Sequence, residues 1–362
     1  MPVLTKRAFL AGIAATPCFA RATKAASPVF APEPGAWVRY QVSTTLNLEP
    51  PKTLAQAWVP LPSVTSAAWV KPLGNDWQGE GFTAREVDVN GAKMLHVTWP
   101  AGTAAPAITV RSRFASRSRA VDWSKPANVP PLSAAERQFY LDATDYIPVT
   151  GEIQRLSDQI TAGATDERAK VAAIYNWVVC NTYRDHKVLG CGTGNVAAML
   201  KFADFGGKCA DLNGLFVGLV RAAGIPARDI YGVRVAPSAF GYQSLGLKTT
   251  NATKAQHCRA EVFLSGYGWV AMDPADVRKV MLDEPPGNLP LSNPKVEAVR
   301  QALFGGWEGN YMPYNHVNDV VLPGGGGRSL PFLMYPQAQI DGVWLDSLAP
   351  QTVKYGIQAV TL

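Results

Sequence analysis

The sequence predicts a mixed α+β protein in which an antiparallel β-sandwich comes first and a core of helices and a β-hairpin follows. Short runs that alternate between apolar and polar residues fill residues 37–122, and such alternation with regular turn signals is typical of an antiparallel sandwich. From about residue 133 the apolar residues recur at helical spacing instead. The length of 362 residues favours two domains.

The first domain is expected over residues 27–125. It begins with an extended, proline-rich linker, and clusters of Pro, Gly and Asn then separate the predicted strands. These strands are expected at residues 37–42, 56–60, 95–99 and 108–111. His96 stands alone in one of them, and we interpret it as a structural residue.

The second domain is expected over residues 126–362. Ser133 and Glu136 form the sequence signature of a capping box, which starts a helix. A second helix presents Ile153, Leu156 and Ile160 on one face, and a third begins near Thr165. Strand-like runs return after residue 319, and we assign them to the C-terminal part of this domain; they lie at residues 320–322, 330–334 and 354–357.

Composition and charge argue against a nucleic-acid partner. Hydrophobic residues make up 47% of the chain and charged residues 17%, which is enough apolar material for a sizeable core. The formal net charge is +6, but residues 1–26 contain four basic and no acidic side chains, so their removal would leave +2. No basic run with interleaved aromatic residues is present in the sequence.

Residues 1–26 have the three parts of an export signal. Lys6 and Arg7 precede an apolar stretch at residues 8–15, and Ala20-Arg21-Ala22 provides a small-residue cleavage site. Lys6-Arg7 also resembles a twin-arginine motif with Lys in the first place, which leaves the export route open. The alternatives are a short helix of the mature fold and a lipid anchor at Cys18, which Pro17 disfavours. The apolar stretch is too short to span a bilayer, so we expect a periplasmic or secreted protein.

Four cysteines follow this leader: Cys180, Cys191, Cys209 and Cys258. They are too few for a disulfide framework and lack the C-x-x-C pairs of a zinc site. The histidines do not stand near carboxylate or thiol residues at metal-ligand spacing, so we expect no metal and no cofactor. If Cys209 stays a free thiol, the other three allow at most one disulfide, and its pairing is open. The alternative is that all three are buried as small apolar residues.

Cys209 stands at the predicted start of a buried helix. Leu212, Leu215, Phe216 and Leu219 follow amphipathic spacing, and Gly224-Ile225-Pro226 ends the helix. The helix dipole and the unpaired N–H groups at this end stabilise a thiolate and can receive an oxyanion. Gly206 and Gly207 stand three and two residues before Cys209, and we expect them to let a substrate backbone come close.

A predicted β-hairpin brings a histidine and a carboxylate together. Residues 257–263 and 267–273 are strand-like and are separated by Leu264-Ser265-Gly266. If Phe263 pairs with Tyr267, His257 lies directly opposite Asp273 on the same face. A carboxylate at that position can hold the imidazole N–H and fix its tautomer. By the same alternation, Cys258 is expected to point to the opposite face.

These three motifs together resemble the bacterial transglutaminase-like branch of the papain-type thiol enzymes. The resemblance is carried by Gly-Lys-Cys209-Ala-Asp, by His257-x-x-Ala-Glu-Val and by Gly-Trp269-Val-Ala-Met-Asp273-Pro, over roughly residues 190–280. It implies an α+β catalytic core, often preceded by a β-sandwich. Arg259 departs from the pattern, because such proteins commonly have an aromatic residue two positions after the His.

The resemblance implies a catalytic triad in which Cys209 is the nucleophile, His257 the general base and acid, and Asp273 the carboxylate that orients it. The predicted activity is acyl transfer from a peptide or protein amide through a thioester. We expect hydrolysis in preference to transfer to an amine. A cross-linking transamidase and a non-catalytic scaffold remain the alternatives.

Three further residues are weaker candidates. Asn181 and Tyr183 follow the third predicted helix and could line the cleft or contact the oxyanion, although an ordinary polar loop is the simpler interpretation. Glu261 is predicted on the face of His257, and a surface carboxylate is the simpler interpretation there.

Overall fold

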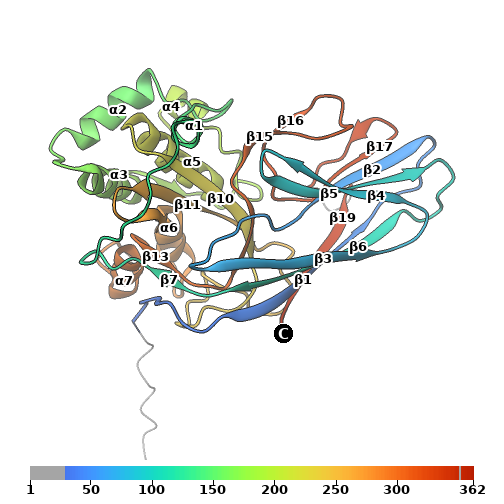
Figure 1. Cartoon of the computed structure of the whole chain (residues 1–362), viewed down its shortest axis with the longest axis horizontal. Coiled ribbons are helices and arrows are strands. Elements are labelled where there is room, and N and C mark those ends of the chain that lie inside the picture. The colour runs from blue at the N-terminus through green and yellow to red at the C-terminus, as the bar shows by residue number, and fades with distance from the viewer. Residues whose placement is uncertain (1–28, 350–351) are drawn as a thin grey trace, which may run out of the picture.

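The computed structural model describes residues 29–349 and 352–362. The predicted export signal at residues 1–26 therefore lies outside the described residues. The predicted α+β class is confirmed: two antiparallel sheets occupy one side of the molecule and a helical core with its own sheet occupies the other (Figure 1).

The two sheets pack face to face as a sandwich. Their shared core combines Leu46 and Ile108 of one sheet with Ala57, Val97 and Trp99 of the other, all buried. The first sheet has the order β19-β1-β6-β3 and the second β18-β17-β2-β5-β4. The strands that come from the N-terminal half are β1 (Val38–Asn47), β2 (Leu54–Pro60), β3 (Val70–Gln78), β4 (Thr83–Val89), β5 (Ala92–Pro100) and β6 (Ala107–Ser116).

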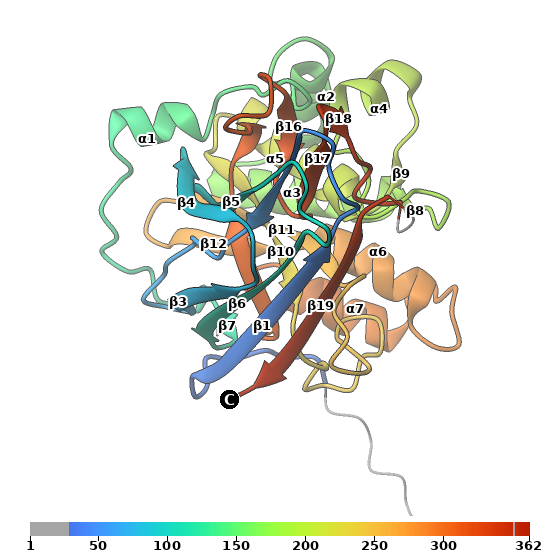
Figure 2. The ribbon, with the colours of Figure 1, turned by 90° about the vertical axis from the view of Figure 1, so that its right-hand side faces the viewer.

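The C-terminal strands complete these two sheets. The sequence places these strands with the second domain, but β17 (Gln337–Ile340) pairs with β2 and β18 (Val343–Trp344) pairs with β17. The last strand, β19 (Lys354–Thr361), pairs with β1 from Asn47 to Tyr40. Figure 2 shows β1 and β19 side by side. The sandwich is thus closed by the end of the chain.

The second part of the molecule is built around a buried helix on an antiparallel sheet. The sheet has the order β12-β11-β10-β14, and α5 packs on β10 and β11. Every residue of α5 from Cys209 to Arg221 is buried. The elements are α5 (Cys209–Ala222), β10 (Ala227–Arg234), β11 (Gln256–Leu264), β12 (Gly268–Met272) and β14 (Tyr311–Asn315).

The predicted helices surround this central pair. The Ser133–Glu136 capping box is present at the first helix. Ile153 of the second helix and Val171, Ile174 and Val178 of the third are buried in the main core. The helices besides α5 are α1 (Ala134–Phe139), α2 (Glu152–Thr161), α3 (Glu167–Asn181), α4 (Val196–Phe202), α6 (Pro274–Asp283) and α7 (Pro294–Ala302).

Three further pairs of short strands lie outside the large sheets. β7 (Arg119–Ala120) pairs with β13 (Gly306–Trp307), β8 (Tyr183–Arg184) runs parallel to β9 (Gly206–Gly207), and β15 (Asn318–Val321) pairs with β16 (Ser329–Phe332). Among the described residues, none of the helices combines the length and the apolar character needed to cross a bilayer.

Candidate active site

Cys209 is the first residue of α5, as predicted, and its thiol is 4% exposed. The side chain of Asp211 organises this helix start. Its Oδ2 accepts the backbone N–H of Lys208 at 2.9 Å, and its Oδ1 accepts the N–H groups of Thr193 and Gly194. Asp211 therefore holds the loop that contains Cys191 against the nucleophile helix.

The two glycines before Cys209 have a different role from the predicted one. A Cβ at Gly206 would lie 2.2 Å from the ring of Tyr183, and one at Gly207 would lie 2.5 Å from the Asp211 side chain. Neither glycine is among the residues that line the cleft. They make room for the protein's own packing, so the prediction of a close substrate approach at these positions is wrong.

His257 and Asp273 are in contact, but the predicted hairpin register is wrong by two residues. Nε2 of His257 lies 2.7 Å from Oδ2 of Asp273. In the ladder, however, Phe263 pairs with Trp269 and Leu264 with Gly268, so the loop is Ser265-Gly266-Tyr267. Buried Leu264 stays in the strand, and Gly266 and Gly268 supply positive φ angles for the turn. A shift of two residues preserves the face of each side chain, which is why the contact survives.

Asp273 lies one residue beyond β12 and caps helix α6. Its Oδ1 accepts the backbone N–H of Asp276 at 3.1 Å. The amide of Asn213, one turn into α5, donates to the same oxygen at 3.1 Å. The carboxylate is fully buried. Asp273 is thus fixed by α5 and α6 while its other oxygen holds His257.

The sequence analysis missed a second carboxylate at the histidine. Asp276 Oδ2 lies 3.4 Å from His257 Nε2, and Nη2 of Arg234 donates to both oxygens of Asp276 at 2.7 and 2.6 Å. The four residues from Asp273 to Asp276 start a helix, so two acids three positions apart could have indicated a shared face. Nothing in the sequence near Arg234 indicates that it reaches them.

Arg259, the departure from the family pattern, lies behind the triad. It is 2% exposed, its guanidinium stacks on Tyr311 and Trp307, and its Nε lies 3.9 Å from Asp273 Oδ2. Arg259 does not line the cleft. Its positive charge lies near the carboxylate of Asp273. Because its side chain does not line the cleft, Arg259 does not determine the shape of the cleft.

The electrostatics favour a thiolate–imidazolium pair. Burial lowers the pKa of His257, but the negative charges of Asp276 and Asp273 outweigh burial and the repulsion from Arg234, and raise it to about 10. Burial would raise the pKa of the Cys209 thiol. Hydrogen bonds from Cys191, Cys258 and His257, together with the positive charge of His257, lower it well below its usual value. A lowered pKa favours the thiolate, which is the form of cysteine that reacts as a nucleophile.

Cys209 and His257 open onto a cleft of about 1050 Å³. Among the described residues, six cationic side chains and no carboxylate line it; the six are Arg184, Lys208, Arg234, Lys248, Lys254 and Lys279. One wall comes from the end of the chain, through Tyr335, Leu348 and Tyr355. Main-chain hydrogen bonds from Ala252 to Ile357 and from Ala359 to Thr250 join β19 to the loop that carries Lys248 and Lys254. The cleft therefore lies where the C-terminal segment meets the helical core.

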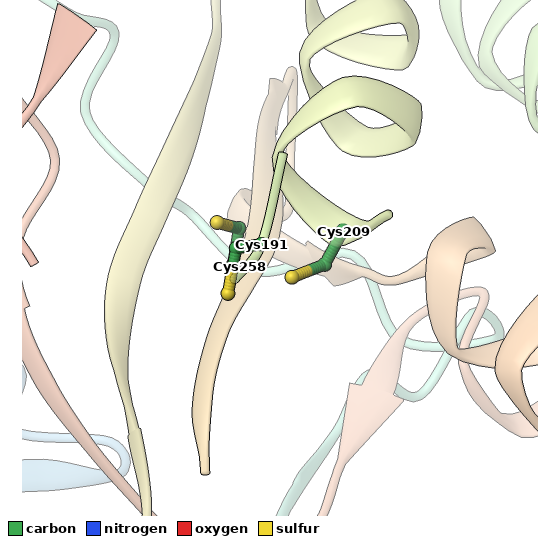
Figure 3. Close-up of side chains that lie close together, drawn as sticks. All are labelled: Cys191, Cys209 and Cys258. Atoms are coloured by element: carbon green, nitrogen blue, oxygen red, sulfur yellow. The ribbon is translucent and has the colours of Figure 1, made fainter. Parts of the chain in front are cut away.

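Three thiols gather at the nucleophile. The Sγ atoms of Cys191, Cys209 and Cys258 all lie within 4.8 Å of one another, and all three residues are buried (Figure 3). Cys258 was expected to point away from the face of His257, yet its Sγ lies within 4.8 Å of that of Cys209. Within residues 29–349 and 352–362, neither these three nor the exposed Cys180 forms a disulfide. One alternative from the sequence was that Cys180, Cys191 and Cys258 are all buried. This is correct for Cys191 and Cys258, whereas Cys180 lies at the surface.

The other candidate residues are structural. Asn181 and Tyr183 are exposed outside the cleft, where they bond to Trp177 O and to Asp204. His96 stacks on Trp58 and bonds to Gln56, as predicted. Glu261 is 1% exposed and pairs with Arg119 and Arg228, so the interpretation as a surface carboxylate is wrong.

Two groups of side chains have the spacing of metal ligands in the described part of the chain. One is His257, Asp273 and Asp276, and the other is the three-thiol cluster. The polar contacts of the first group are accounted for by Arg234, Asn213 and the start of α6. The first group is therefore a complete ion-pair network without a metal.

Comparison with known proteins places this geometry in a family. The transglutaminase-like superfamily matches residues 154–274. An uncharacterized protein of Haemophilus influenzae is 34% identical over 335 residues, which cover 87% of this chain and 89% of that protein.

One solved structure shows the same fold over most of its length. A Cytophaga hutchinsonii protein provisionally named a cysteine protease aligns with 90% of this chain and 99% of its own, at 13% identity and a TM-score of 0.51. The periplasmic domain of TgpA from Pseudomonas aeruginosa covers 68% of this chain and 90% of its own, at 15% identity and a TM-score of 0.33.

The matched residues 154–274 include Cys209, His257 and Asp273. The match runs from α2 to the start of α6, and so contains both the nucleophile helix and the hairpin. The chain belongs to the transglutaminase-like superfamily.

Proposed function

We propose that the protein is an exported cysteine acyl-transfer enzyme that hydrolyses amide bonds. The observation that carries the proposal is a buried thiol of lowered pKa at a helix start, beside an imidazole whose other nitrogen is held by a buried carboxylate. This is the arrangement that activates a cysteine for attack on a carbonyl.

In the first half-reaction, the Cys209 thiolate attacks the amide carbon and a C–S bond forms. The carbonyl oxygen takes up the negative charge. The Ala210 N–H is engaged by Cys191 O at 2.9 Å, so the Cys209 N–H is the first-turn donor that we assign to this oxygen. His257 then gives its proton to the leaving nitrogen, the C–N bond breaks, and a thioester remains.

In the second half-reaction, neutral His257 removes a proton from water, and the resulting hydroxide attacks the thioester. The C–S bond breaks, a carboxylic acid leaves, and the thiolate–imidazolium pair is restored. Because Nε2 faces Asp273, the nitrogen that exchanges protons with the cleft is Nδ1. A cleft of about 1050 Å³ with many polar lining side chains admits water beside an acyl group, which supports hydrolysis.

The charge of the cleft supports an anionic acyl donor. Arg234 is neutralised by Asp276, and Arg184 and Lys279 share Asp283. Lys208, Lys248 and Lys254 have no ion-pair partner among the described residues. A cleft of one sign concentrates ligands of the other. We infer a peptide or protein substrate with carboxylates close to the scissile amide.

The experiment that tests the function is capture of the acyl-enzyme. The full-length protein is mixed with a periplasmic extract, quenched in acid and digested, and the peptide that contains Cys209 is analysed by mass spectrometry. A thioester adduct in the wild type that is absent in Cys209→Ala supports the proposal. A second assay offers a fluorescent primary amine. Incorporation of this amine into product would mean transfer, whereas release of ammonia or a new N-terminus without incorporation would mean hydrolysis.

A further inference from the structure

The three-thiol cluster brings together sulfurs from three separate elements. Cys191 comes from the loop before α4, Cys209 begins α5 and Cys258 lies in β11. Their side chains are 3%, 4% and 0% exposed, and the Sγ atoms lie within 4.8 Å of one another (Figure 3). The proposed acyl transfer uses only one of these sulfurs.

We propose that this cluster binds one Zn²⁺ ion and that the bound ion occupies the nucleophile. Zinc prefers thiolate and imidazole ligands in a tetrahedron. With Zn–S bonds of about 2.3 Å, two sulfurs of a tetrahedral site lie roughly 3.8 Å apart. Sulfurs within 4.8 Å of one another therefore need inward shifts of at most about 1 Å, which side-chain rotation supplies.

The three sulfurs supply three of the four positions of a tetrahedral zinc site. The fourth position is open to the cleft, where a water or an anion can bind, as in zinc sites that have three protein ligands. His257, whose Nε2 is held by Asp273 at 2.7 Å, belongs to the separate group with Asp273 and Asp276.

The surroundings provide access and leave polar groups without partners. Cys191, Cys209 and His257 line the cleft, whereas Cys258 lies behind them, so an ion enters from the cleft side. The hydroxyl of Tyr335, which is 7% exposed and lines the cleft beside Cys191, and Nε2 of Gln256 find no hydrogen-bond partner in residues 29–349 and 352–362. An ion with a water or anion in its shell would satisfy such groups.

Zinc binding would switch off the proposed chemistry reversibly. Cys191 and Cys258 give their thiol protons to solvent, Cys209 binds as the thiolate of its pair with His257, and a lone pair of each sulfur forms a Zn–S bond. The Cys209 lone pair is then no longer available for a carbonyl, and a chelator restores it. No electron is transferred. This inference goes beyond the proposed function, because the binding itself needs no turnover.

The test uses Co²⁺ as a spectroscopic probe on the full-length, reduced protein. A tetrahedral thiolate site gives strong visible d–d absorption and a sulfur-to-metal charge-transfer band. We expect saturation at one Co²⁺ per chain and displacement by Zn²⁺. Cys258→Ala and Cys191→Ala should each weaken Zn²⁺ binding by at least about 100-fold, because each removes a ligand. Cys180→Ala, at the exposed cysteine outside the cluster, is the matched control and should bind as the wild type does.

A second measurement keeps the inference falsifiable if a variant does not fold. Wild-type protein is alkylated with and without Zn²⁺, and each cysteine is quantified by mass spectrometry. Zn²⁺ should protect Cys191, Cys209 and Cys258 at least tenfold more than Cys180. Absence of the Co²⁺ spectrum in reduced wild type, or equal protection of all four cysteines, would overturn the inference. A disulfide between two of the three before reduction, with no metal bound after it, would overturn it too.

Neither readout depends on amide hydrolysis. A protein that binds Co²⁺ through the three thiols but forms no acyl-enzyme would refute the proposed function and leave the zinc site standing. An active enzyme that shows no metal spectrum would do the reverse.

Discussion

The carboxylate of Asp273 holds the ring of His257 and starts helix α6 at the same time. Oδ2 lies 2.7 Å from His257 Nε2, and Oδ1 accepts the backbone N–H of Asp276. The orientation of the imidazole is therefore tied to the position of a helix and not only to the pairing of two strands. Asp273 thus has two roles: its negative charge acts on His257, and its Oδ1 caps helix α6.

Substitutions at Asp273 should separate these two roles. Asn is also a good N-cap residue, so Asp273→Asn should keep α6 but lower kcat/KM by roughly 10²–10⁴-fold, because the charge that stabilises the imidazolium is lost. Asp273→Ala should retain some activity but also lose about 1 kcal/mol of stability with the cap. Kinetics and denaturant unfolding of both variants give the answer. Equal stability losses in the two variants would contradict the capping role.

Cys209 and His257 should both be essential to turnover. Cys209→Ala removes the nucleophile and His257→Ala removes the proton carrier, so each should reduce amide hydrolysis to background while the protein stays folded. Circular dichroism of each variant is the control for folding. Rates like those of the wild type in either variant would refute the assignment of the triad.

The reactivity of Cys209 should persist from neutral to alkaline pH. The reactive form has a Cys209 thiolate and a protonated His257, and the pKa of His257 is about 10. Activity should therefore rise at acidic pH as Cys209 ionises and fall only as pH passes about 10. At neutral pH, iodoacetamide should modify buried Cys209 faster than exposed Cys180. Slower labelling of Cys209 than of Cys180 would favour a non-catalytic scaffold.

The ion pairs of His257 with Asp273 and Asp276 also predict how the stability of the fold depends on pH. The pKa of His257 is raised from its ordinary value of 6.5, so its protonated form stabilises the fold. That contribution is fully present below about pH 6.5 and should be lost as pH rises through about 10. Unfolding midpoints measured between pH 6 and 10.5 would show the loss, and His257→Gln should flatten this part of the profile.

Asp276→Asn should be costly to stability. It leaves the buried guanidinium of Arg234 without its partner, and breaking a buried pair costs about 3–5 kcal/mol. It also removes a charge that raises the pKa of His257, so the alkaline limit of activity should move to lower pH. Glu297→Gln, in a more exposed pair with Arg300, is the control and should cost less than about 1 kcal/mol.

The cleft lysines should select for acidic substrates. Two peptides that differ only by Glu or Gln beside the scissile amide should differ about tenfold in kcat/KM at low salt, and less at high salt. A Lys248→Ala/Lys254→Ala double variant should lose most of this preference. Lys52→Ala, at an exposed lysine outside the cleft, should keep it. Equal rates for both peptides in the wild type would refute the anionic substrate but not the triad.

Short-range patterns in the sequence predicted the helices and strands, but they did not predict which distant strands pair with each other. The capping box at Ser133 and the apolar spacing of α5 depend on residues a few positions apart, and both are present. The pairing of β17 and β19 with β2 and β1 depends on segments at opposite ends of the chain. Strand periodicity says which residues face a core but not which strand lies alongside.

The same distinction applies to the site. The sequence predicted the contact between His257 and Asp273 because one hairpin joins them. The predicted register was wrong by two residues, and a shift of two residues keeps both side chains on the same face. Asp276, Arg234 and Asn213 come from the start of α6, the end of β10 and the second turn of α5. The contacts of Arg234 and Asn213 arise from packing between elements, so no spacing in the sequence predicts them. The convergence of Cys191 and Cys258 on Cys209 has the same origin. Only the three-residue spacing of Asp273 and Asp276 at the start of α6 could have indicated that these two acids share a face.

Strand β19 ties the sandwich to the cleft. It pairs with β1 and is joined to the loop that carries Lys248 and Lys254, and Tyr355 at its start belongs to the cleft wall. Proteolytic removal of β19 would therefore open the sandwich and the cleft together, although Cys209, His257 and Asp273 would all remain in the chain.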